Sequence, residues 1–228
     1  MAGAAPLGVG AVVIDLDGTL LDTVADLSAS ANLMLAGLGL PQVDAAAVRT
    51  FVGKGIANLV RRCLAAALAR EPEAALIERA LPLYESCYEQ VNGRHTTIYP
   101  GVVEGLDALR AKALPLGCIT NKSQRFTVPL LRQVALDGYF ALTLSGDSLP
   151  RKKPDPLPLA HAARHFGVAP ARLLMIGDSV NDAQAARAAG CPVFCVDYGY
   201  NEGGDVRSLD IDAIVPSIAA AAERVVKV

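Results

Sequence analysis

The stretch that decides the fold is GAVVIDLDGTLLD, residues 10–22, in which an apolar run ends at acidic residues. An apolar run without polar alternation is typical of a strand covered on both faces, so we expect a strand over residues 9–16. Asp15 and Asp17 lie two residues apart at its end, and a period-two backbone places both side chains on one side. Gly18 then allows a turn that other residues resist. The pattern predicts either a reactive carboxylate pair or a polar loop that caps the strand.

The same pattern of short apolar runs recurs along the chain. Further strands are expected over residues 116–120, 173–176, 192–196 and 213–215. Helical patterns separate them, over residues 102–113, 124–134, 156–166 and 181–189. This alternation predicts an α/β fold with a mostly parallel, Rossmann-like sheet, in which ligands bind at the carboxyl ends of the strands.

The segment that follows the first strand breaks this alternation, because it is nearly all helix-like. One helical pattern begins at Asp22, and Asp44 can serve as the N-cap of a second helix. Two more helical patterns span residues 56–70 and 73–90. We therefore expect an α/β core of residues 1–22 and 93–228, with an inserted helical cap subdomain of residues 23–92. Both crossings of this insertion lie beside the end of the first strand, so the cap is expected to cover Asp15.

Three further clusters follow the later strands. They are Thr120-Asn121-Lys122, the KKPDP loop that contains Lys153, and GDSVND, which contains Asp178 and Asp182. A hydroxyl and free backbone N–H groups suit phosphate oxygens, and flanking prolines stiffen the loop around Lys153. Taken alone, each cluster is also explained by helix capping or by a solvated turn.

Taken together, the clusters predict a site for phosphoryl transfer at one edge of the sheet. Four carboxylates and one lysine would meet there, those of Asp15, Asp17, Asp178, Asp182 and Lys153. Such an excess of negative charge calls for a divalent cation, and an all-oxygen ligand set favours Mg²⁺. One carboxylate can attack phosphorus while its neighbour acts as an acid and then as a base.

The order of these motifs, DxDGTLxD, then TN, then KP, then GDSxND, resembles that of the haloacid dehalogenase-like hydrolases. The resemblance covers the whole chain and implies that the helical insertion is the small cap of that family. It implies Asp15 as the nucleophile and Asp17 as the acid that protonates the leaving alcohol and then activates water. It also implies that Asp15, the Asp17 backbone carbonyl and Asp178 hold Mg²⁺, with Asp182 in support. An aspartate at position 17 is typical of the phosphatases of the family rather than of its dehalogenases.

The resemblance also implies contacts with the phosphoryl group and with the rest of the substrate. Gly18, Thr120, Asn121 and Lys153 would hold the phosphate, and Lys153 would be one of the catalytic residues. Five stretches carry a further similarity: DTVADL (22–27), VGKG (52–55), YPGV (99–102), TNK (120–122) and KPDP (153–156). They resemble the phosphoglycolate phosphatase-like subfamily, which implies 2-phosphoglycolate as the substrate. We expect Lys54, between two glycines in the cap, to reach the substrate carboxylate, although a solvated loop lysine is the alternative. His95, in the loop that returns from the cap, has no predicted role.

Two alternative functions stay open. A phosphatase of another small ester, such as a sugar phosphate or pyrophosphate, would share most of these motifs. A non-catalytic phospho-acceptor switch of the receiver type also combines acidic residues, a hydroxyl, a lysine and Mg²⁺. In a receiver domain, however, the acceptor aspartate lies on a middle strand, and no helical insertion follows the first strand. The DxDGT start and the helical insertion of this chain differ from that arrangement.

Composition excludes several classes of partner. The chain has 228 residues, a net charge of −2 and only 5% aromatic residues, which gives no basic footprint for nucleic acid. No stretch resembles a membrane span or a signal peptide, and the five scattered cysteines suit buried thiols of a reduced protein. We expect a cytoplasmic enzyme, a monomer or a homodimer, whose partner is a small phosphate ester.

Overall fold

A six-stranded parallel sheet forms the centre of the protein, which a computed structural model describes over residues 6–228. The strand order is β6-β5-β2-β7-β8-β9. The strands are β2 (Ala11–Ile14), β5 (Leu116–Ile119), β6 (Leu142–Leu144), β7 (Leu173–Gly177), β8 (Val193–Val196) and β9 (Ala213–Val215). Every residue of β2, β5, β7 and β8 is buried, so the expected α/β fold with a parallel sheet is confirmed.

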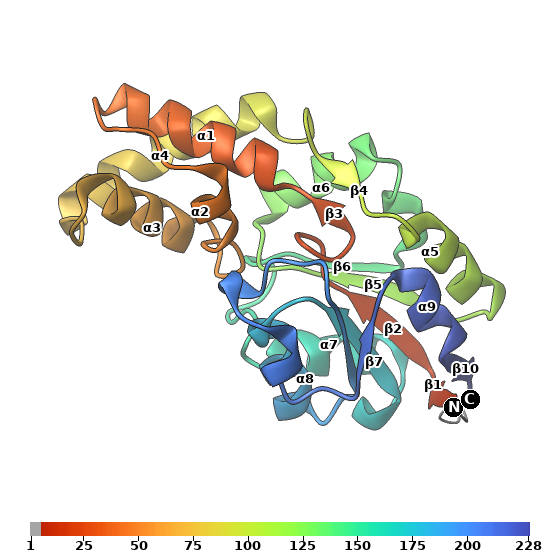
Figure 1. Ribbon diagram of the computed structural model, residues 1–228. Helices are drawn as coiled ribbons and strands as arrows, with labels where there is room; N and C mark the ends of the chain where they lie inside the picture. Colours follow the sequence, from red (N-terminus) through yellow and green to blue (C-terminus); the bar gives the residue numbers. More distant parts are fainter. Residues whose placement is uncertain (1–5) are drawn as a thin grey trace.

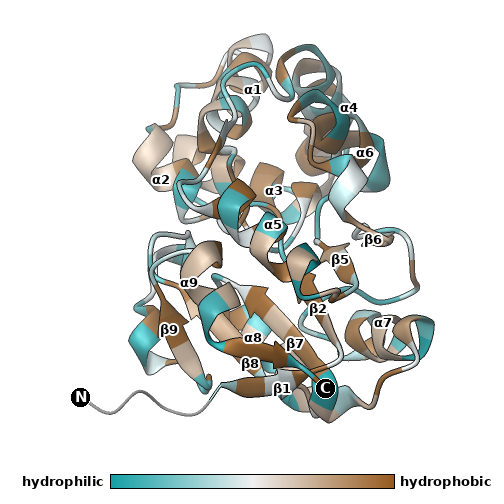
Figure 2. Ribbon diagram, turned by 90° about the vertical axis from the view of Figure 1, so that its right-hand side faces the viewer, coloured by the Kyte–Doolittle hydropathy of each residue, from teal (hydrophilic) through white to brown (hydrophobic). Residues whose placement is uncertain are grey.

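Helices on both faces of the sheet explain why β2 is apolar at every position. Val12 and Ile14 pack in one core cluster with helices α5 (Val102–Ala111), α6 (Gln124–Gln133) and α9 (Ile218–Glu223). Ala11 and Val13 face the opposite cluster, which contains α7 (Leu157–Phe166) and α8 (Val180–Ala189). Figure 2 shows the hydrophobic strands enclosed between these helices.

The expectation of one strand over residues 9–16 is wrong at both ends. The chain divides at Gly10 into β1 (Leu7–Val9), which pairs with β10 (Val225–Lys227), and β2 of the main sheet. An added Cβ at Gly10 would lie 2.7 Å from Val168 Cγ1, so a glycine allows the chain to bend past this side chain. At the other end, the carbonyl of Leu16 accepts hydrogen bonds from the N–H groups of the following turn, which ends the strand.

The insertion contains four helices, which we call the helical unit: α1 (Val24–Gly37), α2 (Ala45–Arg49), α3 (Ile56–Leu68) and α4 (Ala74–Val91). They share a separate hydrophobic cluster that includes Met34, Leu64 and Tyr84. Figure 1 shows the unit beyond the carboxyl end of β2. Asp44 caps α2 as expected, because its side chain accepts a hydrogen bond from Ala46 N. The α3 helix ends two residues earlier than expected, since Ala69 adopts a left-handed conformation.

Two linkers connect the helical unit to the sheet, and they lie against each other. Strands β3 (Leu21–Asp22) and β4 (Thr97–Ile98) pair antiparallel. The buried carboxylate of Asp26, in the first turn of α1, accepts hydrogen bonds from the backbone N–H groups of Gly93, His95 and Thr96 and from the Thr96 hydroxyl. The start of the helical unit is therefore tied to its return segment. Over residues 6–228, no helix is long and apolar enough to cross a membrane.

Candidate active site

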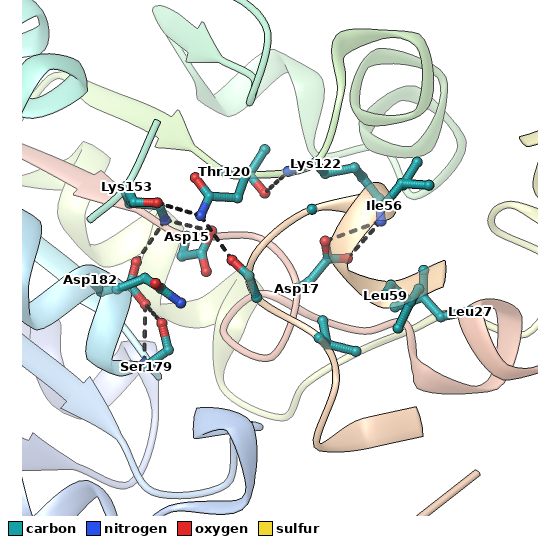
Figure 3. A pocket seen from close by; sticks show the side chains of 15 residues that line it. Asp15, Asp17, Leu27, Ile56, Leu59, Thr120, Lys122, Lys153, Ser179 and Asp182 are labelled. Atoms are coloured by element: carbon teal, nitrogen blue, oxygen red, sulfur yellow. Dashed lines mark hydrogen bonds and ion pairs between the residues drawn. The ribbon is translucent and has the colours of Figure 1, made fainter. Parts of the chain in front are cut away.

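Loops at the carboxyl ends of three adjacent strands converge on one pocket. Asp15 follows β2, Thr120 follows β5 and Asp178 follows β7, and these strands are neighbours in the order β5-β2-β7. Lys153 comes from the loop before α7. Figure 3 shows the side chains of Asp15, Lys153 and Asp182 on one side of the pocket and apolar side chains of the helical unit on the other.

The buried ammonium group of Lys153 joins two carboxylates. Its Nζ atom lies 2.8 Å from Asp15 Oδ1 and 2.6 Å from Asp182 Oδ1, and it donates a hydrogen bond to Ile119 O. Burial alone would lower the pKa of Lys153, but the attraction of both carboxylates raises it above its ordinary value. Lys153 therefore stays charged at neutral pH and is held next to Asp15.

Asp182 is fixed by hydrogen bonds within the GDSVND motif. Its Oδ2 atom accepts from the N–H groups of Asp178 and Ser179, at 3.2 and 3.1 Å, and from Ser179 Oγ at 2.7 Å. The contacts with Ser179 form a capping box at the start of α8. An added Cβ at Gly177 would overlap the Asp182 carboxyl group, so a side chain there would displace it. Asp182 thus orients Lys153 and the strand-end loop.

Asp178 is held by the loop that follows β2 and by the loop that follows β8. Its Oδ1 atom accepts from Thr19 Oγ1 at 2.9 Å, and its Oδ2 atom accepts from Tyr200 N at 2.6 Å. Gly18 has a φ of +88°, and an added Cβ would lie 2.5 Å from Asp178 Oδ2. A glycine at position 18 is therefore required both by the turn and by the close approach of Asp178.

The buried acidic groups fit a divalent cation. One carboxylate oxygen from each of Asp15, Asp178 and Asp182 lies within 4.8 Å of the others. Burial raises the pKa of Asp15 well above its ordinary value, Lys153 opposes this, and the other two carboxylates add to it. Burial and the Asp182 charge likewise raise the pKa of Asp178 to about 6. Lys153 alone does not balance this negative charge, whereas a Mg²⁺ ion with oxygen ligands would.

The carboxylate of Asp17 points to a different part of the pocket from that of Asp15. It lies 3.0 and 3.1 Å from Lys122 Nζ, and its Oδ1 atom accepts a hydrogen bond of 2.7 Å from Thr23 Oγ1. The resemblance implies that the Asp17 backbone carbonyl, and not this carboxylate, holds the cation. Lys122, which is 5% exposed, had no predicted role. The one available signal was its place directly after Thr120 and Asn121 in the same strand-end loop.

Thr120 and Asn121 line the pocket as expected, but their polar groups differ in how they are used. Thr120 Oγ1 accepts a hydrogen bond of 3.2 Å from Lys122 N. The side-chain amide of Asn121 donates to Lys153 O and to Gly53 O of the helical unit, each at 2.8 Å. Asn121 therefore connects the strand-end loops to the helical unit, and its Nδ2 atom is occupied by these contacts.

The structure does not bring Lys54 to the pocket. Its flanking residues Gly53 and Gly55 line the pocket, but the Lys54 ammonium forms an ion pair of 2.9 Å with Glu202, and the side chain is 49% exposed. Among the residues that the structure describes, Lys54 is not one of those that line the pocket, and its contact with a substrate stays a prediction. The physical reason for this position is the nearby Glu202 carboxylate, which attracts the lysine outward.

Comparison with known proteins places the chain in a family. Residues 12–196 match the model of the haloacid dehalogenase-like hydrolases, and the chain belongs to this family. It is 55% identical over 222 residues to a phosphoglycolate phosphatase of Thiobacillus denitrificans, covering 97% of this chain and 98% of that one. It is 44% identical to a phosphoglycolate phosphatase of Nitrosococcus oceani, covering 91% and 92% of the two chains.

A solved structure has the same fold. The crystal structure of a predicted phosphoglycolate phosphatase from Haemophilus somnus matches with a TM-score of 0.88 and 33% sequence identity. The match covers 92% of this chain and 95% of that chain. The fold similarity therefore extends over the sheet and the helical unit together.

Proposed function

We propose that the protein is a Mg²⁺-dependent phosphatase that hydrolyses 2-phosphoglycolate to glycolate and phosphate through an aspartyl-phosphate intermediate. The observation that carries this proposal is the buried Asp15 carboxylate, 2.8 Å from the Lys153 ammonium and within 4.8 Å of the Asp178 and Asp182 carboxylates. The substrate is supported by the phosphoglycolate phosphatases at 55% and 44% identity.

In the first step, a carboxylate oxygen of Asp15 attacks phosphorus and the ester bond breaks. The leaving alkoxide oxygen takes a proton from Asp17, which gives glycolate and an aspartyl-phosphate on Asp15. Gly18, Thr120, Asn121 and Lys153 are the proposed contacts of the phosphoryl group. Asn121 would act through its backbone N–H group, whereas the Gly18 N–H group donates to Leu21 O, so Gly18 would act by allowing the turn to pass close to the phosphate. The fixed charge of Lys153 stabilises the negative charge that spreads over these oxygens in the transition state.

In the second step, Asp17 removes a proton from a water molecule, and the water oxygen attacks phosphorus. The bond between phosphorus and Asp15 breaks, which releases phosphate and restores the Asp15 carboxylate and the protonated carboxyl group of Asp17. Asp15, Asp178 and the Asp17 backbone carbonyl would hold Mg²⁺, with Asp182 in support. When bound, this ion supplies positive charge that lets the anionic phosphate approach the carboxylates.

We also propose that residues 23–92 form a cap over a core of residues 1–22 and 93–228. The support is the contact of Asn121 with Gly53 O, which joins the strand-end loops to the helical unit beside the pocket. A cap in contact with the core excludes water while the aspartyl-phosphate forms. The enzyme is further proposed to act in the cytoplasm, which agrees with its free and mostly buried cysteines. It is proposed to be a monomer or a homodimer.

A phosphate-release screen tests the substrate and the class of reaction together. The purified protein is given 2-phosphoglycolate, several sugar phosphates, phosphoserine and pyrophosphate, with Mg²⁺ or with a chelator. We expect the highest kcat/KM for 2-phosphoglycolate and loss of turnover with the chelator. A higher kcat/KM for a sugar phosphate or for pyrophosphate would replace the proposed substrate, and one stable phosphorylation without turnover would indicate a switch instead of an enzyme.

A further inference from the structure

The side of the pocket formed by the helical unit is largely apolar, and the side chain of Lys122, from the loop that follows β5, extends beside it. Leu27, Val52, Ile56 and Leu59 line this side. Among the residues that the structure describes, the cations that line the pocket are Lys153, at the strand ends, and Lys122, on the apolar side. A small substrate that carries a second anionic group beyond its phosphate therefore meets Lys122.

Lys122 is buried and in contact with a carboxylate. Its Nζ atom lies 3.0 Å from Asp17 Oδ1 and 4.9 Å from the centre of the Tyr88 ring. The Tyr88 ring in turn packs against Phe126, with ring centroids 4.7 Å apart. Water screens a buried ammonium less than an exposed one, so the buried Lys122 attracts an anion placed beside it more strongly than an exposed lysine does.

The positively charged side chains of the helical unit that lie near the pocket are bound to protein groups outside it. Lys54 pairs with Glu202. Arg49 donates to the carbonyl oxygens of Tyr198 and Gly199, and Arg62 donates to Thr50 O. At the strand ends, Lys153 is engaged by Asp15 and Asp182. Lys122 is therefore the pocket cation whose position suits the non-phosphate end of a substrate.

We propose that Lys122 binds the carboxylate of the substrate and so selects small phosphate esters that carry one; this rests on the proposed function of the pocket. In 2-phosphoglycolate a methylene group separates the ester oxygen from the carboxylate. With phosphorus at Asp15 and the ester oxygen at Asp17, the carboxylate lies on the side of Asp17 where Lys122 is found. Lys122 then contacts both the Asp17 carboxyl group, which carries the proton for the leaving oxygen, and the substrate carboxylate.

The test compares two substrates that differ mainly in the carboxylate. Ethyl phosphate replaces the carboxylate of 2-phosphoglycolate with a methyl group, and the ratio of the two kcat/KM values measures selection for the carboxylate. Lys122→Met removes the charge with little change in length. We expect it to reduce this ratio about 10- to 100-fold, mainly through KM for 2-phosphoglycolate.

Matched variants separate this role from a structural one. Lys54→Met removes the other candidate lysine and is expected to leave the ratio unchanged. Lys122→Arg keeps a positive charge and is expected to restore part of the ratio. If Lys122→Met is poorly folded by its thermal unfolding, Lys122→Gln replaces it in the same assay.

A binding measurement removes the contribution of Asp17 to the chemistry. In an Asp15→Asn background, calorimetry with Mg²⁺ compares 2-phosphoglycolate and ethyl phosphate with and without Lys122→Met. We expect Lys122→Met to weaken only the binding of 2-phosphoglycolate. Equal losses for both substrates would overturn the proposal for Lys122, as would loss of the ratio in Lys54→Met alone. If the wild type does not hydrolyse 2-phosphoglycolate, the proposed function itself fails, which this comparison shows before any variant is examined.

Discussion

The two sides of the pocket differ in how their charged groups are held. At the strand ends, Lys153, Asp178 and Asp182 are engaged by several hydrogen bonds or ion pairs each, most of them to the loops that follow β2 and β7. On the side of the helical unit, the walls are apolar and Lys122 has Asp17 as its ion-pair partner. A dense network fixes geometry, whereas a single ion pair leaves the lysine able to accept a second anion.

This difference assigns the reaction and the choice of substrate to different parts of the chain. Groups that act on phosphorus need positions fixed to fractions of an ångström, and a sheet edge provides them. Groups that bind the variable part of a substrate need only the right charge and shape. Substitutions at the strand ends are therefore expected to affect every substrate, and substitutions on the other side to affect some of them.

The largest expected effect is that of Asp15→Asn. Because the amide is a poor nucleophile, we expect the kcat for every substrate to fall by about 10⁴-fold or more. Folding is expected to be retained, since the change removes a buried charge from an acidic cluster. Phosphate release and thermal unfolding check both statements. Substantial remaining turnover would show that Asp15 is not the nucleophile.

Asp182→Ala is expected to affect stability. It leaves Lys153 without one of its two carboxylates and the Ser179 N–H without its acceptor, and breaking a buried ion pair costs about 3–5 kcal/mol. Urea denaturation measures the free energy of unfolding. The matched control is Asp210→Ala, whose side chain is 82% exposed in its ion pair with Arg187, and it is expected to stay within about 0.5 kcal/mol of the wild type. An equal decrease in the free energy of unfolding of the two variants would show that the buried Asp182–Lys153 pair stabilises the fold no more than a surface ion pair does.

Mg²⁺ is expected to stabilise the protein more as the pH rises. In the metal-free protein, burial and Asp182 raise the pKa of Asp178 from 3.8 to about 6. Between these values the folded state holds a proton that the unfolded chain has released, so this group's contribution to stability falls as pH rises through the window. Mg²⁺ binds the deprotonated carboxylate and offsets that loss.

Calorimetric unfolding with and without Mg²⁺ measures this effect. With the ion at about 100 times its Kd, a gain of about 2.7 kcal/mol is expected near pH 7.5 and a smaller gain near pH 5. The stability of Asp178→Asn is expected to depend less on Mg²⁺. A gain that is the same at both pH values would contradict binding at the buried carboxylates.

The smallest expected effect is that of Ile56→Ala on the side of the helical unit. Ile56 lines the pocket and is only partly buried. Removing part of an apolar wall admits water near the substrate, and we expect kcat/KM for 2-phosphoglycolate to fall less than about tenfold. Steady-state kinetics and Mg²⁺ titration measure this together. A change in Mg²⁺ affinity would show that the two sides of the pocket are coupled.

The positions at the sheet edge were predictable because they follow from local pattern and a general property of parallel sheets. A strand that ends at Asp15 and another that ends at Asp178 must place both residues at the same edge if the strands are parallel. The structure places them there, with carboxylate oxygens within 4.8 Å of each other. No knowledge of distant contacts is needed for this step.

Other features depend on contacts between segments far apart in sequence. The break at Gly10 depends on Val168, and the pairing of Lys122 with Asp17 joins residues 105 positions apart. Lys54 turns outward because Glu202, 148 positions away, lies beside it. The contacts of Gly10 and Lys54 depend on how segments outside the sheet are placed against it, whereas Asp17 and Lys122 follow the neighbouring strands β2 and β5 at one sheet edge. Local hydrophobic patterns do not contain the information that places Glu202 beside Lys54, so the sequence did not predict this ion pair.

The paired linkers have a consequence for how this fold can change over evolution. Strands β3 and β4 pair with each other, so the two ends of the inserted segment leave the core side by side. The distance that an inserted segment must span is therefore short, whatever its length. The entropic cost of closing a loop grows only slowly with its length, so an insertion of another size there would cost the core little. Evolution can thus replace the helical unit with a segment of another fold, provided that the new segment has a side chain that, like Asp26, binds the backbone of the return segment.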